Sequence, residues 1–108
     1  IMTTRMCLIR HGETDWNRQR RIQGQMDIPL NATGRAQASA TASRTAIHRF
    51  QALYSSDLGR AVETAGPIGE RNNLRVRPLS QIRERNYGLF QGLTQEEAAH
   101  RYPHAYRR

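Results

Sequence analysis

The sequence predicts an α/β fold built around a mostly parallel sheet, and two observations support this prediction. Segments whose apolar patterns suit short strands alternate along the chain with longer segments that suit helices. The composition, with 37% hydrophobic and 24% charged residues, is typical of a globular domain. Neither an internal repeat nor a low-complexity tract divides the 108 residues, so we expect them to belong to a single domain.

The first half of the chain predicts a strand, a helix and a second strand. Residues 5–9 form a short apolar run that ends at a turn, as in a strand buried on both faces. Asn31 is placed to cap a helix that continues to about Ile47. One face of this helix is expected to carry small residues: Gly34, Ala36, Ala38 and Ala40. Residues 51–55 suit the second strand.

The second half predicts a helix, a third strand and a final helix. Asp57 is a suitable N-cap for a helix over residues 58–70. Residues 74–79 alternate apolar and basic side chains, as a strand does. The sequence Thr-Gln-Glu-Glu then opens a helix over residues 94–102 with a capping box, and Pro103 ends it.

Three polar segments each directly follow a predicted strand: residues 10–12, 55–60 and 83–84. Parallel sheets bind ligands beyond the carboxyl ends of their strands. We therefore expect these segments to converge at one edge of the sheet, where their arginines and histidine suit a phosphate group.

The segment Arg10-His11-Gly12 carries the most specific chemistry. A histidine after a buried strand can point an imidazole nitrogen at a phosphorus atom while an arginine holds the oxygens, and glycine allows a close backbone approach. Three residues alone are equally compatible with a structural histidine in a turn.

The longer pattern resembles the signature of the histidine phosphatase superfamily, which includes cofactor-dependent phosphoglycerate mutases and fructose-2,6-bisphosphatases. Four ordered blocks carry the resemblance: LIRHGETDWN in residues 8–17, QG, DIPL, G and QA in 23–38, SSDLGRA and ETA in 55–65, and ERNYG and QGL in 84–93. The resemblance implies a phosphoglycerate mutase-like, three-layer α/β/α fold. Members are usually about twice as long and carry a second pocket histidine later, so residues 1–108 are expected to be the N-terminal portion of one domain that is incomplete at its C-terminus.

The resemblance also implies roles for individual residues. His11 is implied to be the nucleophile that forms a phosphohistidine, Arg10 and Arg60 to neutralise phosphoryl oxygens, and Glu84 to be the general acid. Further contacts to phosphate or substrate are implied for Asn17, Gln23, Gly24, Arg85 and Tyr87. Such phosphoryl transfer requires positioning and positive charge but no metal or other cofactor, except that a mutase needs a 2,3-bisphosphoglycerate primer.

Without this pattern, Arg60 and Glu84 have plainer interpretations. Arg60 alone suits a solvated helix residue, and Glu84 suits an ion-pair partner of Arg83 or Arg85. The four blocks together favour the catalytic interpretation.

The resulting functional prediction is a metal-independent phosphomonoester hydrolase that acts on a small phosphorylated metabolite through a phosphohistidine. Residues 21–25 resemble the phosphatase branch, whereas residues 84–88 are mutase-like, so a 2,3-bisphosphoglycerate-dependent phosphoglycerate mutase remains the alternative. The net charge of +8 leaves a third possibility, a non-catalytic basic binding module on the same scaffold. The arginines are spread along the chain without interleaved stacking aromatics, so no nucleic-acid partner is expected.

Metal binding and secretion are not expected. His100 and His104 have the separation of a helical metal pair, but Pro103 lies between them and disrupts that geometry. Cys7, the single cysteine, is predicted to be a buried strand residue, and it cannot form an internal disulfide. The sequence has no signal-peptide pattern and no apolar run of about 18 to 20 residues, which predicts a cytoplasmic protein without a membrane partner. An incomplete sheet would expose an apolar edge, so a homo-oligomer is a further expectation.

Overall fold

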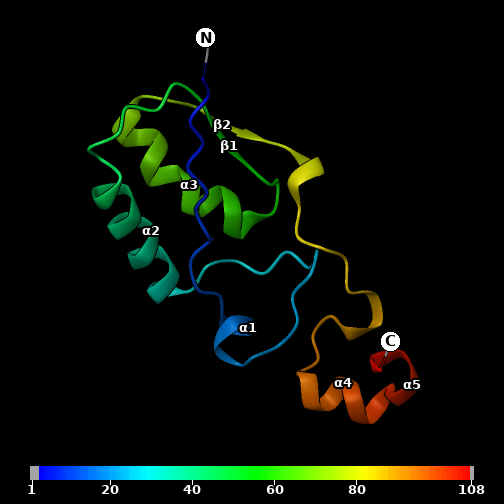
Figure 1. The fold of residues 1–108 in the computed structure, drawn as a ribbon. Helices are drawn as coiled ribbons and strands as arrows, with labels where there is room; N and C mark the ends of the chain where they lie inside the picture. Colours follow the sequence, from blue (N-terminus) through cyan, green and yellow to red (C-terminus); the bar gives the residue numbers. More distant parts are fainter. Residues whose placement is uncertain (1–2, 108) are drawn as a thin grey trace.

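The computed structural model describes residues 3–107, and its centre is a parallel β-α-β unit (Figure 1). Strand β1 (Leu53–Ser55) leads into helix α3 (Gly59–Asn72), which leads into strand β2 (Val76–Pro78). The strands pair in parallel with Leu53 opposite Val76 and Ser55 opposite Pro78. The predicted parallel α/β architecture is therefore confirmed, although each strand is shorter than its sequence pattern.

Helix α2 (Ala32–Arg44) packs against α3, and α3 in turn contacts both strands. The remaining elements are short: α1 (Asp15–Arg18), the 3-10 turns η1 (Ser80–Ile82) and η2 (Gly88–Phe90), α4 (Gln95–Arg101) and α5 (Pro103–Tyr106). Figure 1 shows α4 and α5 together, away from the α2–α3 pair. None of the helices in residues 3–107 has the length and apolar character needed to cross a bilayer.

The small-residue face of α2 has a different spacing from the predicted one. Its buried residues are Gly34, Ala38 and Ala42, which lie four positions apart, whereas Ala36 and Ala40 are exposed. One face of a helix recurs every three to four residues, so a run of small residues two apart cannot all face the same neighbour. Asn31 caps α2 as predicted, its side chain accepting a hydrogen bond from the Gly34 N–H at 2.8 Å.

Helix α2 ends at Arg44, before the predicted end at Ile47. The backbone N–H groups of Ala46 and His48 bond to carbonyls three residues earlier, at Ser43 and Thr45, so the chain turns out of the α-helical pattern. Ile47 is consequently 85% exposed.

Asp57 does not cap α3, contrary to the prediction. The N-cap is Leu58, which makes no capping bond through its side chain, and the Gly59 N–H instead donates to Asp27 Oδ1 at 2.7 Å. The Asp57 carboxylate is held by Arg83 from another part of the chain. A distant charged partner has overridden the local capping preference.

Residues 5–9 do not form the predicted strand. Met6 and Leu8 are 79% and 87% exposed, and Cys7 is also exposed instead of buried. A strand exists only where a neighbouring strand supplies hydrogen bonds, and within residues 3–107 none pairs with this segment. The apolar pattern indicated a tendency to be buried but could not supply the partner.

The capping box at Thr94 is confirmed. The Thr94 hydroxyl accepts from the Glu97 N–H at 3.1 Å, and the Glu97 carboxylate accepts from the Thr94 N–H at 2.9 Å. The helix ends at Arg101, and Pro103 opens the next short helix, where its missing N–H costs nothing.

Candidate active site

The three polar segments predicted to converge line one cavity of about 490 Å³. The cavity lies between the N-terminal segment, β1 and α3. Its polar lining includes residues of the loop before α1, of β1 and the loop after it, of α3 and of the segment after η1: Arg10, His11, Tyr54, Ser55, Ser56, Arg60, Thr64, Arg83 and Glu84. Convergence at this edge therefore holds even though the first predicted strand is absent.

His11 is half-buried and has a defined tautomer. Its Nδ1 lies 2.6 Å from the Gly12 carbonyl, which can only accept, so Nδ1 carries the proton and Nε2 carries the lone pair. Burial lowers the pKa of His11 below its ordinary value, and the charges of Arg60 and Arg10 lower it further, while the bond to Gly12 opposes them. A neutral imidazole with a free Nε2 is the form that can attack an electrophile.

The backbone beside His11 is anchored to α3 and α2. The Gly12 N–H donates to Thr64 Oγ1 at 2.9 Å, and that hydroxyl donates to the Arg60 carbonyl at 2.7 Å. A Cβ atom at Gly12 would collide with the Gly34 carbonyl, and one at Gly34 would collide with the Glu13 carbonyl. The two glycines thus allow the first turn of α2 to lie directly against the histidine loop.

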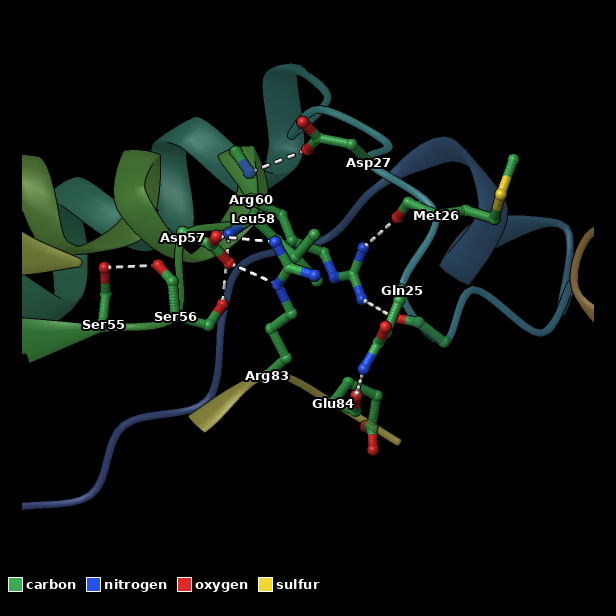
Figure 2. A network of polar contacts seen from close by, with 12 residues as sticks. Gln25, Met26, Asp27, Ser55, Ser56, Asp57, Leu58, Arg60, Arg83 and Glu84 are labelled. Carbon is green, nitrogen blue, oxygen red and sulfur yellow. Dashed lines mark hydrogen bonds and ion pairs between the residues drawn. The ribbon is translucent and has the colours of Figure 1, made fainter. Parts of the chain in front are cut away.

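Arg60 is only 2% exposed, which excludes the solvated-helix interpretation. One terminal nitrogen, Nη1, donates to the Met26 carbonyl at 2.6 Å, and Nη2 donates to the Gly24 carbonyl (Figure 2). Burial lowers the pKa of the Arg60 guanidinium, and Glu84 and Asp27 act in the opposite direction. A guanidinium has five N–H donors, so two backbone contacts orient it and leave others for an anion.

Glu84 lies at the exposed side of the cavity. Its Oε1 accepts from the Arg85 backbone N–H at 2.7 Å, and its carbonyl accepts from Gln25 Nε2 at 3.1 Å. The neighbouring arginine side chains are engaged elsewhere: Arg83 binds Asp57, and the Arg85 guanidinium lies 5.5 Å from the centroid of the Tyr87 ring.

Five other residues singled out from the sequence lie outside the cavity lining, as far as the described part of the chain shows: Asn17, Gln23, Gly24, Arg85 and Tyr87. Asn17 and Gln23 both bond to the buried Thr14, through its N–H at 3.0 Å and its hydroxyl at 2.6 Å. They shape the turn that follows His11, and Gly24 supplies a carbonyl to Arg60.

Sequence reasoning missed the contributions of Thr64, Gly34 and the Asp57–Arg83 pair. Thr64 and Gly34 belong to the quoted blocks, but no local pattern indicates which distant backbone group each one meets. Opposite charges at positions 57 and 83 were visible in the sequence, yet many other pairings were equally possible.

The lining of the cavity is electrostatically suited to an anion. It contains the half-buried His11, Arg10 and Arg60 against one carboxylate, that of Glu84, while the charge of Arg83 is matched by Asp57. Within residues 3–107 there is no group of three or more His, Cys, Asp or Glu side chains arranged to hold a metal ion. Among the described residues, guanidinium groups supply positive charge to the cavity.

Comparisons with known proteins extend this picture. The family described as "Histidine phosphatase superfamily (branch 1)" matches residues 6–108. An uncharacterized phosphatase, PhoE, of Bacillus subtilis is 44% identical over 100 residues, which are 93% of this chain and 52% of that protein. A probable phosphoglycerate mutase, GpmB, of Escherichia coli O1:K1 / APEC is 43% identical over 95 residues, 83% of this chain and 44% of that protein.

A solved structure gives the same likeness in three dimensions. Mycobacterial glucosyl-3-phosphoglycerate phosphatase in complex with VO3 superposes with a TM-score of 0.82 and 42% identity, covering 86% of this chain and 44% of that one. The chain thus spans about half the length of the relatives it matches.

Proposed function

The chain belongs to branch 1 of the histidine phosphatase superfamily, and from this premise we propose that the protein is a metal-independent phosphomonoester hydrolase acting through a phosphohistidine. One observation carries the proposal. His11 holds its proton on Nδ1 at the Gly12 carbonyl, so Nε2 carries the lone pair, and none of the hydrogen bonds within residues 3–107 uses Nε2. The imidazole lines a cavity together with Arg10, Arg60 and Glu84. This arrangement supplies a nucleophile, two cationic oxygen-binding groups and an acid.

In the first step, Nε2 of His11 attacks the phosphorus in line with the ester oxygen. The N–P bond forms as the P–O bond to the leaving group breaks, and Glu84 gives its proton to the departing alkoxide. Arg10 and Arg60 stabilise the negative charge on the remaining oxygens, and two-pronged donors suit this role better than point charges.

In the second step, water attacks the phosphohistidine. The Glu84 carboxylate takes a proton from the water as the new O–P bond forms, and the N–P bond breaks to return neutral His11 and inorganic phosphate. The cycle closes on protons, because Glu84 regains from the water in the second step the proton that it gave to the leaving group in the first.

The proposed substrate is a small phosphorylated metabolite. A cavity of about 490 Å³ lies within the range of roughly 300 to 1,000 Å³ typical of small-molecule sites. The arginines account for the phosphate, and the apolar residues Leu8, Ile9 and Ile82 line another part of the cavity.

A phosphoglycerate mutase is the second candidate, favoured by the likeness to the probable mutase GpmB. A mutase uses the same first step but passes the phosphoryl group to a second hydroxyl instead of water. It therefore depends on a 2,3-bisphosphoglycerate primer, which a hydrolase does not need.

The proposal is tested by the hydrolysis of p-nitrophenyl phosphate in the presence of EDTA. We expect activity that survives the chelator and is lost in His11→Ala but kept in His100→Ala, which removes an exposed histidine on α4. Acid-labile, base-stable labelling from a radioactive phosphate donor should likewise require His11. Loss of activity with EDTA, or activity in His11→Ala, would contradict the proposal, and activity only after 2,3-bisphosphoglycerate is added would favour the mutase.

A further inference from the structure

We propose that Asp57 is a positioning residue for Glu84, which it holds at the cavity through a two-bond ion pair with Arg83. The inference rests on the proposed function, since it assumes that Glu84 is the acid. It concerns two residues that the catalytic scheme itself does not use.

The ion pair joins two segments that are 26 positions apart in the chain. Arg83 Nε lies 2.6 Å from Asp57 Oδ1, and Arg83 Nη2 lies 2.6 Å from Asp57 Oδ2 (Figure 2). Parallel bonds of this kind determine the orientation of both planar groups as well as their separation. The hydrogen bonds from Arg83 hold the pKa of Asp57 below its ordinary value, so the carboxylate stays charged.

Asp57 is available for this contact because a different carboxylate accepts the hydrogen bond from the first N–H group of α3. It stands two positions before α3 and one position before the N-cap residue, Leu58, so it lies outside the capping position. Asp27 accepts the hydrogen bond from Gly59 instead. The Asp57 carboxylate can therefore point across to Arg83, as Figure 2 shows.

Few other contacts hold Glu84 in place. Residues 83–87 lie between two short 3-10 turns without regular secondary structure. Among residues 3–107, the Glu84 backbone is held by one further side chain, that of Gln25 at its carbonyl, and the Glu84 carboxylate accepts from the Arg85 N–H. Because Arg83 directly precedes Glu84, fixing the Arg83 guanidinium to Asp57 also ties the acid to the start of α3, the helix that carries Arg60.

The ion pair has a second consequence for Glu84. An Arg83 side chain released from Asp57 could turn to the neighbouring Glu84 carboxylate and hold it in the charged form, which cannot donate a proton. Loss of Asp57 is therefore expected to impair proton donation both by displacing the acid and by freeing a competing cation.

The test compares two esters that differ in their need for an acid. The nitrophenolate leaving group departs without a proton, whereas the alkoxide of β-glycerophosphate needs one. We expect Asp57→Asn to lower kcat/KM for β-glycerophosphate by about tenfold relative to p-nitrophenyl phosphate. Arg83→Gln should do the same, the double variant should be no worse than either single one, and Arg83→Lys should be intermediate because it keeps the charge but loses the second bond.

The matched control is Glu97→Gln, which neutralises the surface ion pair between Glu97 and Arg21 away from the cavity. It should leave the ratio of the two substrates unchanged. An equal loss for both substrates in Asp57→Asn and Arg83→Lys, or no loss, would overturn the positioning role. If His11→Ala still hydrolyses both esters, the proposed function itself fails; if it hydrolyses neither while Asp57→Asn keeps the normal ratio, only this inference fails.

Discussion

The two sides of the cavity are built by different means. The nucleophile side, defined as residues 10–14 with Arg60 and Thr64 of α3, rests on buried hydrogen bonds between backbone and side-chain groups. The acid side, defined as residues 83–87 with Asp57 and Gln25, rests on an exposed ion pair and surface amides.

This difference matches the demands on each group. The nucleophile must meet the phosphorus in line, and buried contacts give it a single geometry. The acid must reach the leaving group in the first step and the attacking water in the second, and its side chain lies exposed at the cavity. Substitutions on the nucleophile side should therefore cause large losses of activity and stability. Those on the acid side should cause smaller losses that depend on salt concentration.

The largest expected effect comes from Arg60→Lys. A lysine keeps the charge but cannot reach the Met26 and Gly24 carbonyls and the phosphate at once, so kcat/KM should fall about 100-fold and stability by about 1–3 kcal/mol. Steady-state kinetics and urea unfolding measure these losses. Arg35→Lys is the control, because exposed Arg35 also donates to a backbone carbonyl, that of Leu30, away from the cavity. Equal losses of activity in Arg60→Lys and Arg35→Lys would contradict a special role for the Arg60 guanidinium at the cavity.

The second-largest effect is expected for Gly34, and substitution of a second glycine, Gly66, serves as the comparison. Gly34→Ala places a methyl group against the Glu13 carbonyl and should cost about 1–3 kcal/mol of stability while displacing the His11 loop. Gly66→Ala, within α3, meets nothing within 4 Å apart from its chain neighbours. A methyl group before Pro67 crowds the proline ring and offsets the gain in helix propensity, so stability should change by less than about 0.5 kcal/mol. Thermal unfolding of the two variants gives the measurement. Equal tolerance of both would mean that α2 does not constrain the loop.

The third prediction concerns pH. Because burial holds the pKa of His11 below 6.5, the acid limb of kcat/KM should lie below that pH. The unfolded chain binds this proton first as the pH falls through 6.5, so acidification should destabilise the wild type, and the loss should stop growing below the folded pKa. His11→Gln should lack this part of the loss, and NMR titration should place the midpoint of His11 below 6.5. A His11 titration at or above 6.5 would contradict the burial argument.

Local signals predicted local structure well. The Asn31 cap and the Thr94 capping box depend on residues within one helical turn, and both are present. The alternation of elements also predicted that Arg10, Arg60 and Glu84 would lie at one edge, and all three line the cavity.

The errors arose where a distant partner decides the outcome. The apolar pattern of residues 5–9 could not reveal that none of the described residues would pair with them. The capping preference of Asp57 could not reveal Arg83, which offers two charged hydrogen bonds in place of one from an amide. Such contacts on both sides of the cavity depend on the three-dimensional arrangement and not on spacing in the sequence.

The smallest expected effect is a change in substrate preference at high salt, which should act on the acid side and not on the nucleophile side. At about 1 M salt the screening length falls to roughly 3 Å, which weakens exposed charge pairs but not buried hydrogen bonds between neutral groups. The preference for β-glycerophosphate over p-nitrophenyl phosphate should therefore fall by up to about threefold, because only that ester needs the acid side. Salt also competes for the phosphate site, but it does so for both esters, and their ratio cancels this effect. In the double variant Asp57→Asn with Arg83→Gln, which lacks both charges of the pair, the ratio should be flat with salt. A flat ratio in the wild type would show that the acid side does not depend on its ion pair.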